Sequence, residues 1–302
     1  MSRHVAVLMG GWSVEREISL ISGREVAKGL RARGYRVTEV DAGHNVAEVL
    51  TNLNPDVVFN ALHGRWGEDG CIQGICEVLQ IPYTHSGVLA SAIAMDKPIT
   101  IRILETVGIR CAEGKVVRRE DVYKADVMAR PYVVKPANEG SSVGIRIVKP
   151  GDNLPPEPAW AELDELMVER FIPGREITVA VMGDKPLGVT ELRPKTGFYD
   201  YENKYTDGRT EHFCPAPIHA DAYAEAMEAA VLAHRTLKCR GISRSDFRYD
   251  DTGGEPGALY FLEINTQPGL TPLSLVPELA RHAGIDFESL VAWIVEDAGC
   301  PR

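Results

Sequence analysis

The chain has 302 residues, of which 44% are hydrophobic and 25% charged, and 33 basic against 43 acidic side chains give a formal net charge of −10. This length allows two or three domains with substantial cores, and the composition suits a soluble globular enzyme. The acidic excess argues against a general nucleic-acid surface, so local basic groups must bind any anionic ligand.

Six cysteines stand at positions 71, 76, 111, 214, 239 and 300, and no Cys-x-x-Cys pair occurs. This spacing suggests neither a zinc site nor a disulfide framework, and it is typical of a protein from a reducing cytosol. The first apolar run, Val5 to Met9, is too short for the core of a signal peptide, and no later run could span a bilayer. We therefore expect a cytoplasmic protein with no membrane or nucleic-acid partner.

Strands and helices alternate over the first hundred residues. His4 to Met9 predicts a buried strand, an amphipathic helix follows from about Val14 to Arg33, and Gly34 ends it. Tyr35 to Val40 and Asp56 to Ala61 predict two further strands. This alternation indicates a doubly wound, parallel α/β sheet.

After Pro98 the pattern changes to short antiparallel strands. The strands predicted around a small sheet are Tyr132 to Lys135, Gly144 to Val148, Met167 to Phe171 and Glu176 to Met182. Gly151 to Pro158 predicts a surface loop. The remaining predicted elements are a helix at Asp221 to Lys238, a hairpin of strands Gly241 to Tyr249 and Leu259 to Asn265, and closing helices near Leu275 to His282 and Phe287 to Asp297.

Polar side chains recur at every second position on the two strands of this hairpin. Residues two apart share a face of a strand, so Arg244 lies beside Asp246, and Glu263 beside Asn265. Their oxygens suit Mg²⁺, which takes few protein ligands and completes its shell with water and substrate phosphates. The alternative is an ordinary Arg–Asp ion pair on a solvated sheet face. The second polar pair at hairpin spacing favours a site for Mg²⁺ and phosphate.

The sequence lacks the two common glycine-rich nucleotide motifs, the P-loop and the dinucleotide fingerprint. Another segment could bind phosphates, because Asn138 to Gly144 follows the strand lysine Lys135 and offers hydroxyls and backbone N–H groups in a Ser-Ser turn. Such a turn could also close over a ligand. Taken alone, a plain hairpin turn explains this segment better, so a phosphate role depends on the other motifs.

Two loops place further polar groups at the carboxyl edge of the parallel sheet, where open α/β sheets bind ligands. Glu15 lies in the first turn of the first helix, and His63 opens a glycine-containing loop after the strand that ends near Leu62. Glu15 has an alternative role as a complement to the helix dipole. His63 could titrate near neutrality or could be an ordinary loop histidine with capping acids nearby. Two such loops on one edge favour a ligand site.

Taken together, these segments resemble the D-alanine:D-alanine ligase family of the ATP-grasp superfamily. The resemblance rests on segments in the same order along nearly the whole chain: 10–23 (GGWSVEREISLISG), 63–74 (HGRWGEDGCIQG), 95–100 (MDKPIT), 133–144 (VVKPANEGSSVG), 168–179 (VERFIPGREITV), 198–206 (FYDYENKYT), 243–247 (SRSDF) and 263–277 (EINTQPGLTPLSLVP). It implies an N-terminal substrate-binding domain (1–96), a central ATP-grasp domain (97–183) and a C-terminal ATP-grasp and catalytic domain (184–302), with ATP clamped between the latter two.

The resemblance also implies roles for individual residues. Around ATP we expect Lys97, Lys135, Ser142 and Lys204 at the phosphates, Glu169, Arg170, Phe171 and Ile172 at the adenine, and Glu176 at the ribose. Two Mg²⁺ ions, for which Mn²⁺ could substitute, would be held by Asp246, Glu263 and Asn265. For the amino acids we expect Glu15 and His63 at the first D-alanine, Ser274 and Leu275 at the second, Arg244 and the Gly269 N–H at the reacting carboxyl, and Ser141 and Tyr205 linking a closing loop to Glu15.

The activity implied by the resemblance is ATP-dependent ligation of two D-alanines through an acyl phosphate, a step in the synthesis of peptidoglycan precursors, by a homodimeric cytoplasmic enzyme. The alternative within the superfamily is a D-alanine:D-lactate ligase, but relatives that make the depsipeptide tend to lack a tyrosine such as Tyr205. A ligase of the biotin-carboxylase kind has no use for Glu15 and the His63 loop. A silent ATP-binding module would be expected to lose Arg244, Glu15 or Ser274, and all three are present. Arg170 departs from the family, in which lysine is common there.

Overall fold

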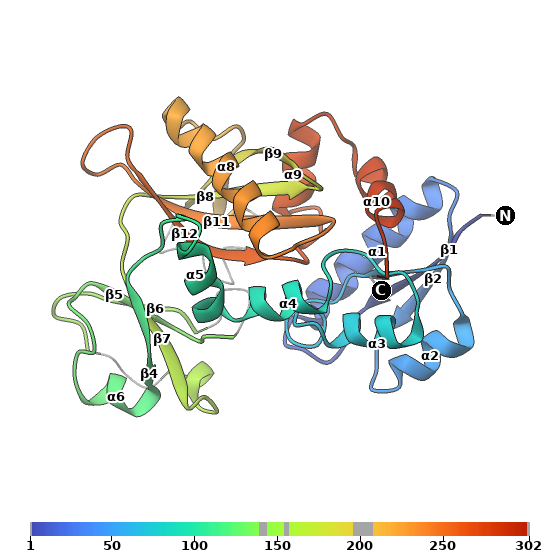
Figure 1. Cartoon of the computed structure of the whole chain (residues 1–302), viewed down its shortest axis with the longest axis horizontal. Helices are drawn as coiled ribbons and strands as arrows, with labels where there is room; N and C mark the ends of the chain where they lie inside the picture. The colour runs from blue at the N-terminus through green and yellow to red at the C-terminus, as the bar shows by residue number, and fades with distance from the viewer. Residues whose placement is uncertain (1, 139–143, 154–156, 196–207, 301–302) are drawn as a thin grey trace.

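The computed structural model describes residues 2–138, 144–153, 157–195 and 208–300, and Figure 1 shows how their helices and strands are arranged. Within these ranges no helix is long and apolar enough to cross a membrane. The strands form three sheets, with orders β2-β1-β3, β4-β7-β5-β6 and β10-β9-β8-β11-β12. The fold is therefore built around one parallel and two antiparallel sheets.

The N-terminal sheet is parallel, as the alternation predicts. Its central strand β1 (His4–Met9) pairs with β2 (Arg36–Asp41) and β3 (Val57–Asn60). Successive β1 side chains face opposite cores: Val5, Val7 and Met9 lie in one buried cluster, and Ala6 and Leu8 in another. The first cluster is covered by α1 (Arg16–Ala32) and α10 (Phe287–Glu296), the second by α2 (Val46–Leu53) and α3 (Cys71–Leu79).

Two helices run from this sheet toward the antiparallel sheets (Figure 1). They are α4 (Val88–Met95) and α5 (Lys97–Glu105). Asp96 caps α5, because its side chain accepts a hydrogen bond from the Ile99 N–H, and Pro98 stands in the first turn, where its missing N–H costs no helical bond. The cap fixes where α5 begins and so where Lys97 lies.

The four-stranded sheet is antiparallel and lies over a small core around the fully buried Trp160. Three of its strands were expected from the sequence, and the edge strand β4 was not. Its elements are β4 (Gly114–Arg118), α6 (Arg119–Lys124), β5 (Tyr132–Lys135), β6 (Arg146–Val148), the short 3₁₀ turn η1 (Pro158–Trp160) and β7 (Glu165–Arg170).

The five-stranded sheet contains β8 (Arg175–Met182), which corrects the expectation that 176–182 belongs to the small sheet. β8 bonds to β9 and β11, and its Ile177 and Val179 pack beneath the alanine-rich α8. Periodicity identifies a strand but does not identify its partner. The other elements are β9 (Lys185–Pro194), β10 (Thr210–Phe213), α8 (Ala220–Thr236), β11 (Ile242–Asp250), β12 (Ala258–Asn265) and α9 (Leu275–His282).

Candidate active site

The predicted hairpin forms, and it brings its polar residues together. In the β11·β12 register Asp246 lies opposite Glu263, and Arg244 opposite Asn265. The Arg244 guanidinium donates to both oxygens of Asp246, from Nε to Oδ1 and from Nη2 to Oδ2, each at 2.9 Å. Thr178 of β8 donates its hydroxyl to Asp246 Oδ1 at 2.6 Å. Asp246 is 4% exposed, and its carboxylate is held from two sides by Arg244 and Thr178.

Lys97 joins this hairpin from the start of α5. Its Nζ lies 3.4 Å from Glu263 Oε2, and its side chain is 8% exposed. The Lys97 N–H donates to the carbonyl of Ala137, which lies in the segment after the strand lysine Lys135. A residue expected at the nucleotide phosphates and a residue expected to bind metal therefore lie side by side.

Lys135 and Glu169 form a buried ion pair on the neighbouring strands β5 and β7. Their Nζ and Oε1 atoms are 2.7 Å apart, and both side chains are 6% exposed. A buried charge is costly without a partner, and each residue supplies the other's. The two residues were expected at opposite ends of ATP, and the structure places them in contact with each other.

The remaining residues expected around ATP lie at the junction of β7 and β8. Glu176 faces Arg248 across the sheet, with 3.6 Å between Oε2 and Nη1, while the Arg248 Nε donates to the carbonyl of Ile172. Burial lowers the pKa of the Arg248 guanidinium, and the nearby Glu176 carboxylate opposes this shift. Ile172 is buried and Phe171 is half-buried. The exposed Arg170 guanidinium lies over the Tyr260 ring, 5.4 Å from its centroid.

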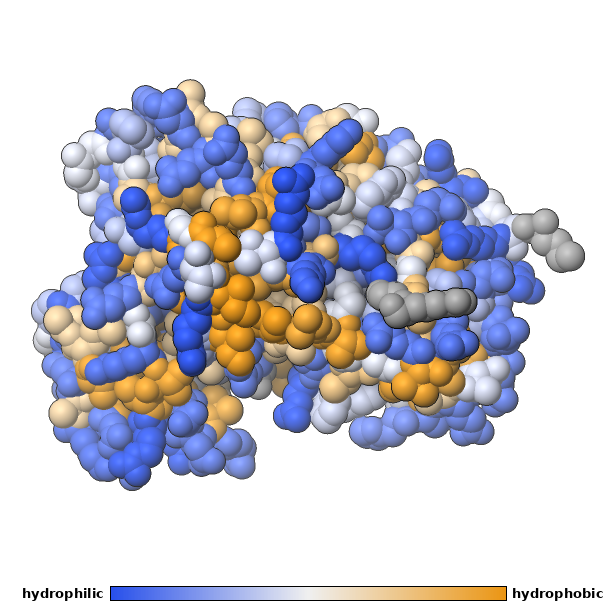
Figure 2. Space-filling model, viewed as in Figure 1, coloured by the Kyte–Doolittle hydropathy of each residue, from blue (hydrophilic) through white to orange (hydrophobic). Residues whose placement is uncertain are grey.

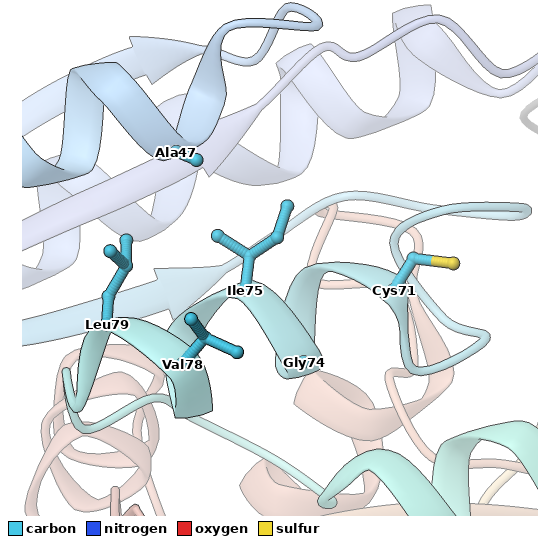
Figure 3. A pocket seen from close by; sticks show the side chains of 6 residues that line it. All are labelled: Ala47, Cys71, Gly74, Ile75, Val78 and Leu79. Atoms are coloured by element: carbon cyan, nitrogen blue, oxygen red, sulfur yellow. The ribbon is translucent and has the colours of Figure 1, made fainter.

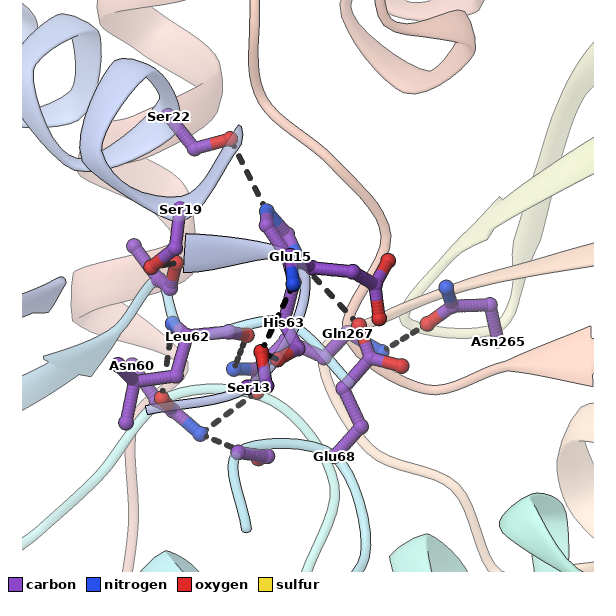
Figure 4. A network of polar contacts seen from close by, with 12 residues as sticks. Ser13, Glu15, Ser19, Ser22, Asn60, Leu62, His63, Glu68, Asn265 and Gln267 are labelled. Carbon is purple, nitrogen blue, oxygen red and sulfur yellow. Dashed lines mark hydrogen bonds and ion pairs between the residues drawn. The ribbon is translucent and has the colours of Figure 1, made fainter. Parts of the chain in front are cut away.

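Glu15 and His63 lie close together at the carboxyl edge of the parallel sheet (Figure 4). Glu15 directly precedes α1 and is 5% exposed, but its side chain makes no capping hydrogen bond to that helix. A Cβ added to Gly64, the neighbour of His63, would lie 2.3 Å from Glu15 Oε2. Glu15 therefore does not cap α1 through its side chain, and its alternative role as a complement to the helix dipole stays open.

Two side chains hold the His63 ring. Its Nε2 lies 3.0 Å from Ser22 Oγ, and its Nδ1 lies 3.2 Å from Glu68 Oε1. Ser13 donates its hydroxyl to the His63 carbonyl at 2.7 Å. The ring is 5% exposed, so both its nitrogens and its backbone are fixed by neighbours from α1 and the adjoining loops.

The residues expected around the second amino acid, Ser274 and Leu275, lie at the start of α9. Ser274 Oγ accepts from the Thr271 N–H at 2.9 Å, and a Cβ on Gly269 would approach that same oxygen to 2.9 Å. The Leu275 side chain is buried against Leu192, so only its backbone can reach a ligand. Backbone N–H groups at a helix N-terminus favour an anion such as a carboxylate.

Four expected site residues, Ser141, Ser142, Lys204 and Tyr205, lie outside the residues that the structure describes. Several partners were not foreseen. Glu68 bonds to His63, and its position five residues later in the same loop was the signal available in the sequence. Ser22, Thr178 and Gln267 bond to residues that are far away in the sequence. Each stands in a segment that carries the family resemblance, but the sequence did not indicate these bonds.

An apolar hollow lies away from these residues, between α2 and α3 (Figure 3). It is lined by Ala47, Cys71, Gly74, Ile75, Val78 and Leu79. This lining has no charged group to bind a phosphate or a carboxylate, so the candidate active site remains at the hairpin and the loops of Glu15 and His63.

Two antiparallel sheets, one carrying the Asp246–Glu263 pair with Lys97 beside it and the other carrying Lys135, are typical of ATP-grasp enzymes. Family models described as the N-terminus and the C-terminus of D-ala D-ala ligase match residues 42–86 and 103–296. The D-alanine–D-alanine ligase of Parvibaculum lavamentivorans is 55% identical to the chain, over 100% of the chain and 99% of its own length. The D-alanine–D-alanine ligase of Paramagnetospirillum magneticum is 56% identical, over 99% of the chain and 100% of its own length. The chain belongs to the D-alanine–D-alanine ligase family.

Solved structures agree with this assignment. A crystal structure of D-alanine–D-alanine ligase from Bacillus anthracis has a TM-score of 0.82 and 31% identity, and another, complexed with ATP, has a TM-score of 0.81 and 30% identity. Each comparison covers 98% of this chain and 97% of the other. The similarity spans all three sheets, so the chain has the ATP-grasp fold of these ligases.

Proposed function

We propose that the chain is an ATP-dependent ligase that joins two D-alanines into D-alanyl-D-alanine and releases ADP and phosphate, for peptidoglycan precursors. The observation that carries this proposal is the proximity of Lys97 and the β11·β12 hairpin, with its Asp246–Glu263 pair, within a chain that matches ligases of this name end to end. The relatives are named for the dipeptide, which favours dipeptide formation over the depsipeptide alternative.

The hairpin's donor set fits Mg²⁺. Asp246 and Glu263 face each other in register, and Asn265 adds an amide oxygen two register positions further along. Mg²⁺ usually takes few protein ligands and completes its shell with phosphates and water, so two carboxylates and one amide oxygen are enough protein ligands for it. We propose that Asp246, Glu263 and Asn265 hold two Mg²⁺ ions, for which Mn²⁺ could substitute. Bound Mg²⁺ would neutralise the negative charge on the phosphate oxygens while the γ-phosphoryl group is transferred.

The nucleotide would lie between the two antiparallel sheets. Lys97 and Lys135 would bind phosphates. Because Lys135 is paired with Glu169 in the structure, bound ATP would take over part of this contact. Glu176, Phe171 and Ile172 would bind the ribose and adenine. Arg170 would contribute through its backbone, because its side chain lies over Tyr260. Ser142 and Lys204 keep their proposed phosphate contacts on the sequence alone.

The D-alanine substrates would bind on the side of the β11·β12 hairpin that faces the carboxyl edge of the parallel sheet, where the loops of Glu15 and His63 lie. Glu15 would bind the ammonium group of the first D-alanine beside His63, which is held in place by Ser22 and Glu68. This placement leaves the substrate carboxylate to attack the γ-phosphate, giving an acyl phosphate. Arg244 and the Gly269 N–H would stabilise the charge that develops when the second amine attacks, since preorganised donors act most strongly there.

The second D-alanine would bind through its carboxylate at Ser274 and the Leu275 N–H, at the start of α9. An acyl phosphate must be kept from water, so we propose that Ser141 and Tyr205 link a closing loop to Glu15. The structure does not describe that loop, and this role rests on the sequence.

We propose three domains, 1–96, 97–183 and 184–302, although the pairing of β8 with β9 and β11 favours a second boundary just before β8. We further propose a cytoplasmic homodimer. Apolar surface that an interface would need is present in a band over α4 and α5 (Figure 2), where Leu89 and Ile99 are 59% and 43% exposed.

An oxygen-label experiment tests the reaction directly. D-alanine labelled with ¹⁸O in its carboxylate should transfer one labelled oxygen to each phosphate released during dipeptide formation, because that oxygen bridges carbon and phosphorus in the acyl phosphate. Unlabelled phosphate accompanied by labelled AMP would indicate activation by adenylylation and would contradict the proposal.

A further inference from the structure

We propose that Gln267 is a positioning residue that fixes the loop of Gly269 and Asn265 against the loop of His63. Gln267 is 1% exposed, and its backbone N–H donates to Asn265 Oδ1 at 2.7 Å. Its side chain crosses to the N-terminal sheet, where Oε1 accepts from Asn60 Nδ2 at 3.0 Å and Nε2 donates to the Leu62 carbonyl at 2.9 Å (Figure 4). This inference rests on the proposed function of the site.

The N-terminal side of this contact is itself a rigid polar network. Asn60 ends β3 and is 1% exposed. Its Nδ2 also donates to the Gly67 carbonyl at 2.8 Å, and its Oδ1 accepts from the Leu62 N–H at 3.2 Å. Leu62 directly precedes His63, so the Gln267 amide bonds to the backbone that positions the histidine.

A second contact joins the same two loops. Ser22 Oγ lies 3.0 Å from His63 Nε2 and accepts from the Leu270 N–H at 3.4 Å. Gly269 therefore lies between two anchor points, Gln267 and Leu270. Its N–H is proposed to meet the reacting carboxyl, where a small displacement of a donor is costly to the rate. The apolar cores hold the sheets together, whereas these directional bonds fix how the two loops face each other.

The Gln267 side chain has a buried donor and a buried acceptor, and both are satisfied across the contact. Replacing it by an apolar residue leaves Asn60 and the Leu62 carbonyl with one fewer partner each in a site closed to water. The expected consequence at the site is a fall in kcat/KM for D-alanine of roughly ten- to hundredfold. The KM for ATP should be unchanged, because no nucleotide residue bonds to this amide.

The test compares Gln267→Met with Gln73→Met, a matched control. Gln73 is also 1% exposed, and its Nε2 donates to the Gly67 carbonyl at 2.8 Å, but this bond stays within the N-terminal unit. Hydrogen exchange without ATP or metal should rise in both 60–68 and 265–270 for Gln267→Met. For the control it should rise around residue 67 alone. The loss of kcat/KM for D-alanine should follow only the first variant.

Hydrogen exchange and kinetics like those of the wild type in Gln267→Met would overturn the proposal. Equal changes in exchange and in kcat/KM for Gln267→Met and Gln73→Met would also overturn it, and so would faster exchange in Gln267→Met that spreads across α8 and the sheet cores. If Gln267→Met does not fold, Gln267→Asn carries the same test, because it keeps the amide but is too short to reach the Leu62 carbonyl. The exchange measurement needs no turnover. A wild-type enzyme without D-alanine-dependent phosphate release would instead contradict the proposed function.

Discussion

Glu15 shows how a single side chain can be tested for two different roles. It is buried and directly precedes α1, yet its carboxylate does not cap the helix. Removing a charged partner from a desolvated ion pair costs about 2 to 5 kcal/mol, or roughly thirty- to several-thousand-fold in binding. Glu15→Gln should therefore raise the KM for the tighter-binding D-alanine by this factor, as measured by steady-state kinetics.

Glu17 supplies the matched control for that change, because it is an exposed acid in the first turn of the same helix. Glu17→Gln should change the melting temperature slightly and the KM for D-alanine not at all. Similar kinetics for the two variants would return Glu15 to a role in complementing the helix dipole.

Asp246 is the second residue at which a small change should have a large effect. Asp246→Asn removes one negative charge from the proposed metal site while preserving the size of a side chain that contacts Arg244 and Thr178. Turnover at ordinary Mg²⁺ should be abolished, with the circular dichroism spectrum unchanged. Asp250→Asn, at the far end of β11, should leave turnover intact. Near-normal activity of Asp246→Asn would remove the metal assignment.

At the scale of elements, the loop after β3 has to let Glu15 approach closely. Gly64 has φ +69°, and a Cβ there would meet Glu15 Oε2. Gly34, which has φ +87°, has open space around its Cβ position. Gly64→Ala should therefore raise the KM for D-alanine at least about tenfold, since an oxygen must move, whereas Gly34→Ala should cost only about 1 kcal/mol of stability. Unchanged kinetics in Gly64→Ala would show that Glu15 need not hold this position.

Helix α8 carries a buried titratable group behind the five-stranded sheet. Burial lowers the pKa of His234 to about 4, and its Nδ1 lies 2.7 Å from Ser243 Oγ of β11. Between this value and the usual pKa of 6.5, the unfolded chain binds the extra proton, so stability rises with pH across this window and falls as pH drops. Between pH 7 and pH 5 the loss from His234 is about 2 kcal/mol.

Urea unfolding at the two pH values measures this contribution. His234→Gln should lose less stability between pH 7 and pH 5 than the wild type does, by about 2 kcal/mol. An identical drop in both proteins would mean that His234 does not titrate in this way.

Local sequence signals predicted the elements that are defined by their own residues. The strands at 132–135 and 4–9 and the helix at 275–282 lie where expected, and the hairpin's polar residues do share a face. Strand pairings and hydrogen bonds between residues far apart in the sequence could not be predicted in the same way. The partner of β8 and the bonds of Gln267 to Asn60, 207 residues away, depend on how the sheets meet.

At the scale of the whole molecule, the first and last parts of the chain pack together around the N-terminal parallel sheet. α10 packs against α1, and its Leu290, Val291 and Ile294 share a core with Val5 and Val7 of β1. The Arg240 guanidinium also donates to the carbonyls of His85 and Tyr83. The N-terminal sheet therefore depends on the C-terminal helix. This packing places the loops of Glu15 and His63 against the β11·β12 hairpin of the same chain.

Substrate-dependent phosphate release is the most direct measurement of the central claim. With Mg²⁺-ATP, the protein should release phosphate rapidly with D-alanine and form one D-alanyl-D-alanine for each phosphate. L-alanine should give background rates, and D-lactate added beside D-alanine should give no depsipeptide. Phosphate release that does not depend on D-alanine, or a depsipeptide as the main product, would contradict the account.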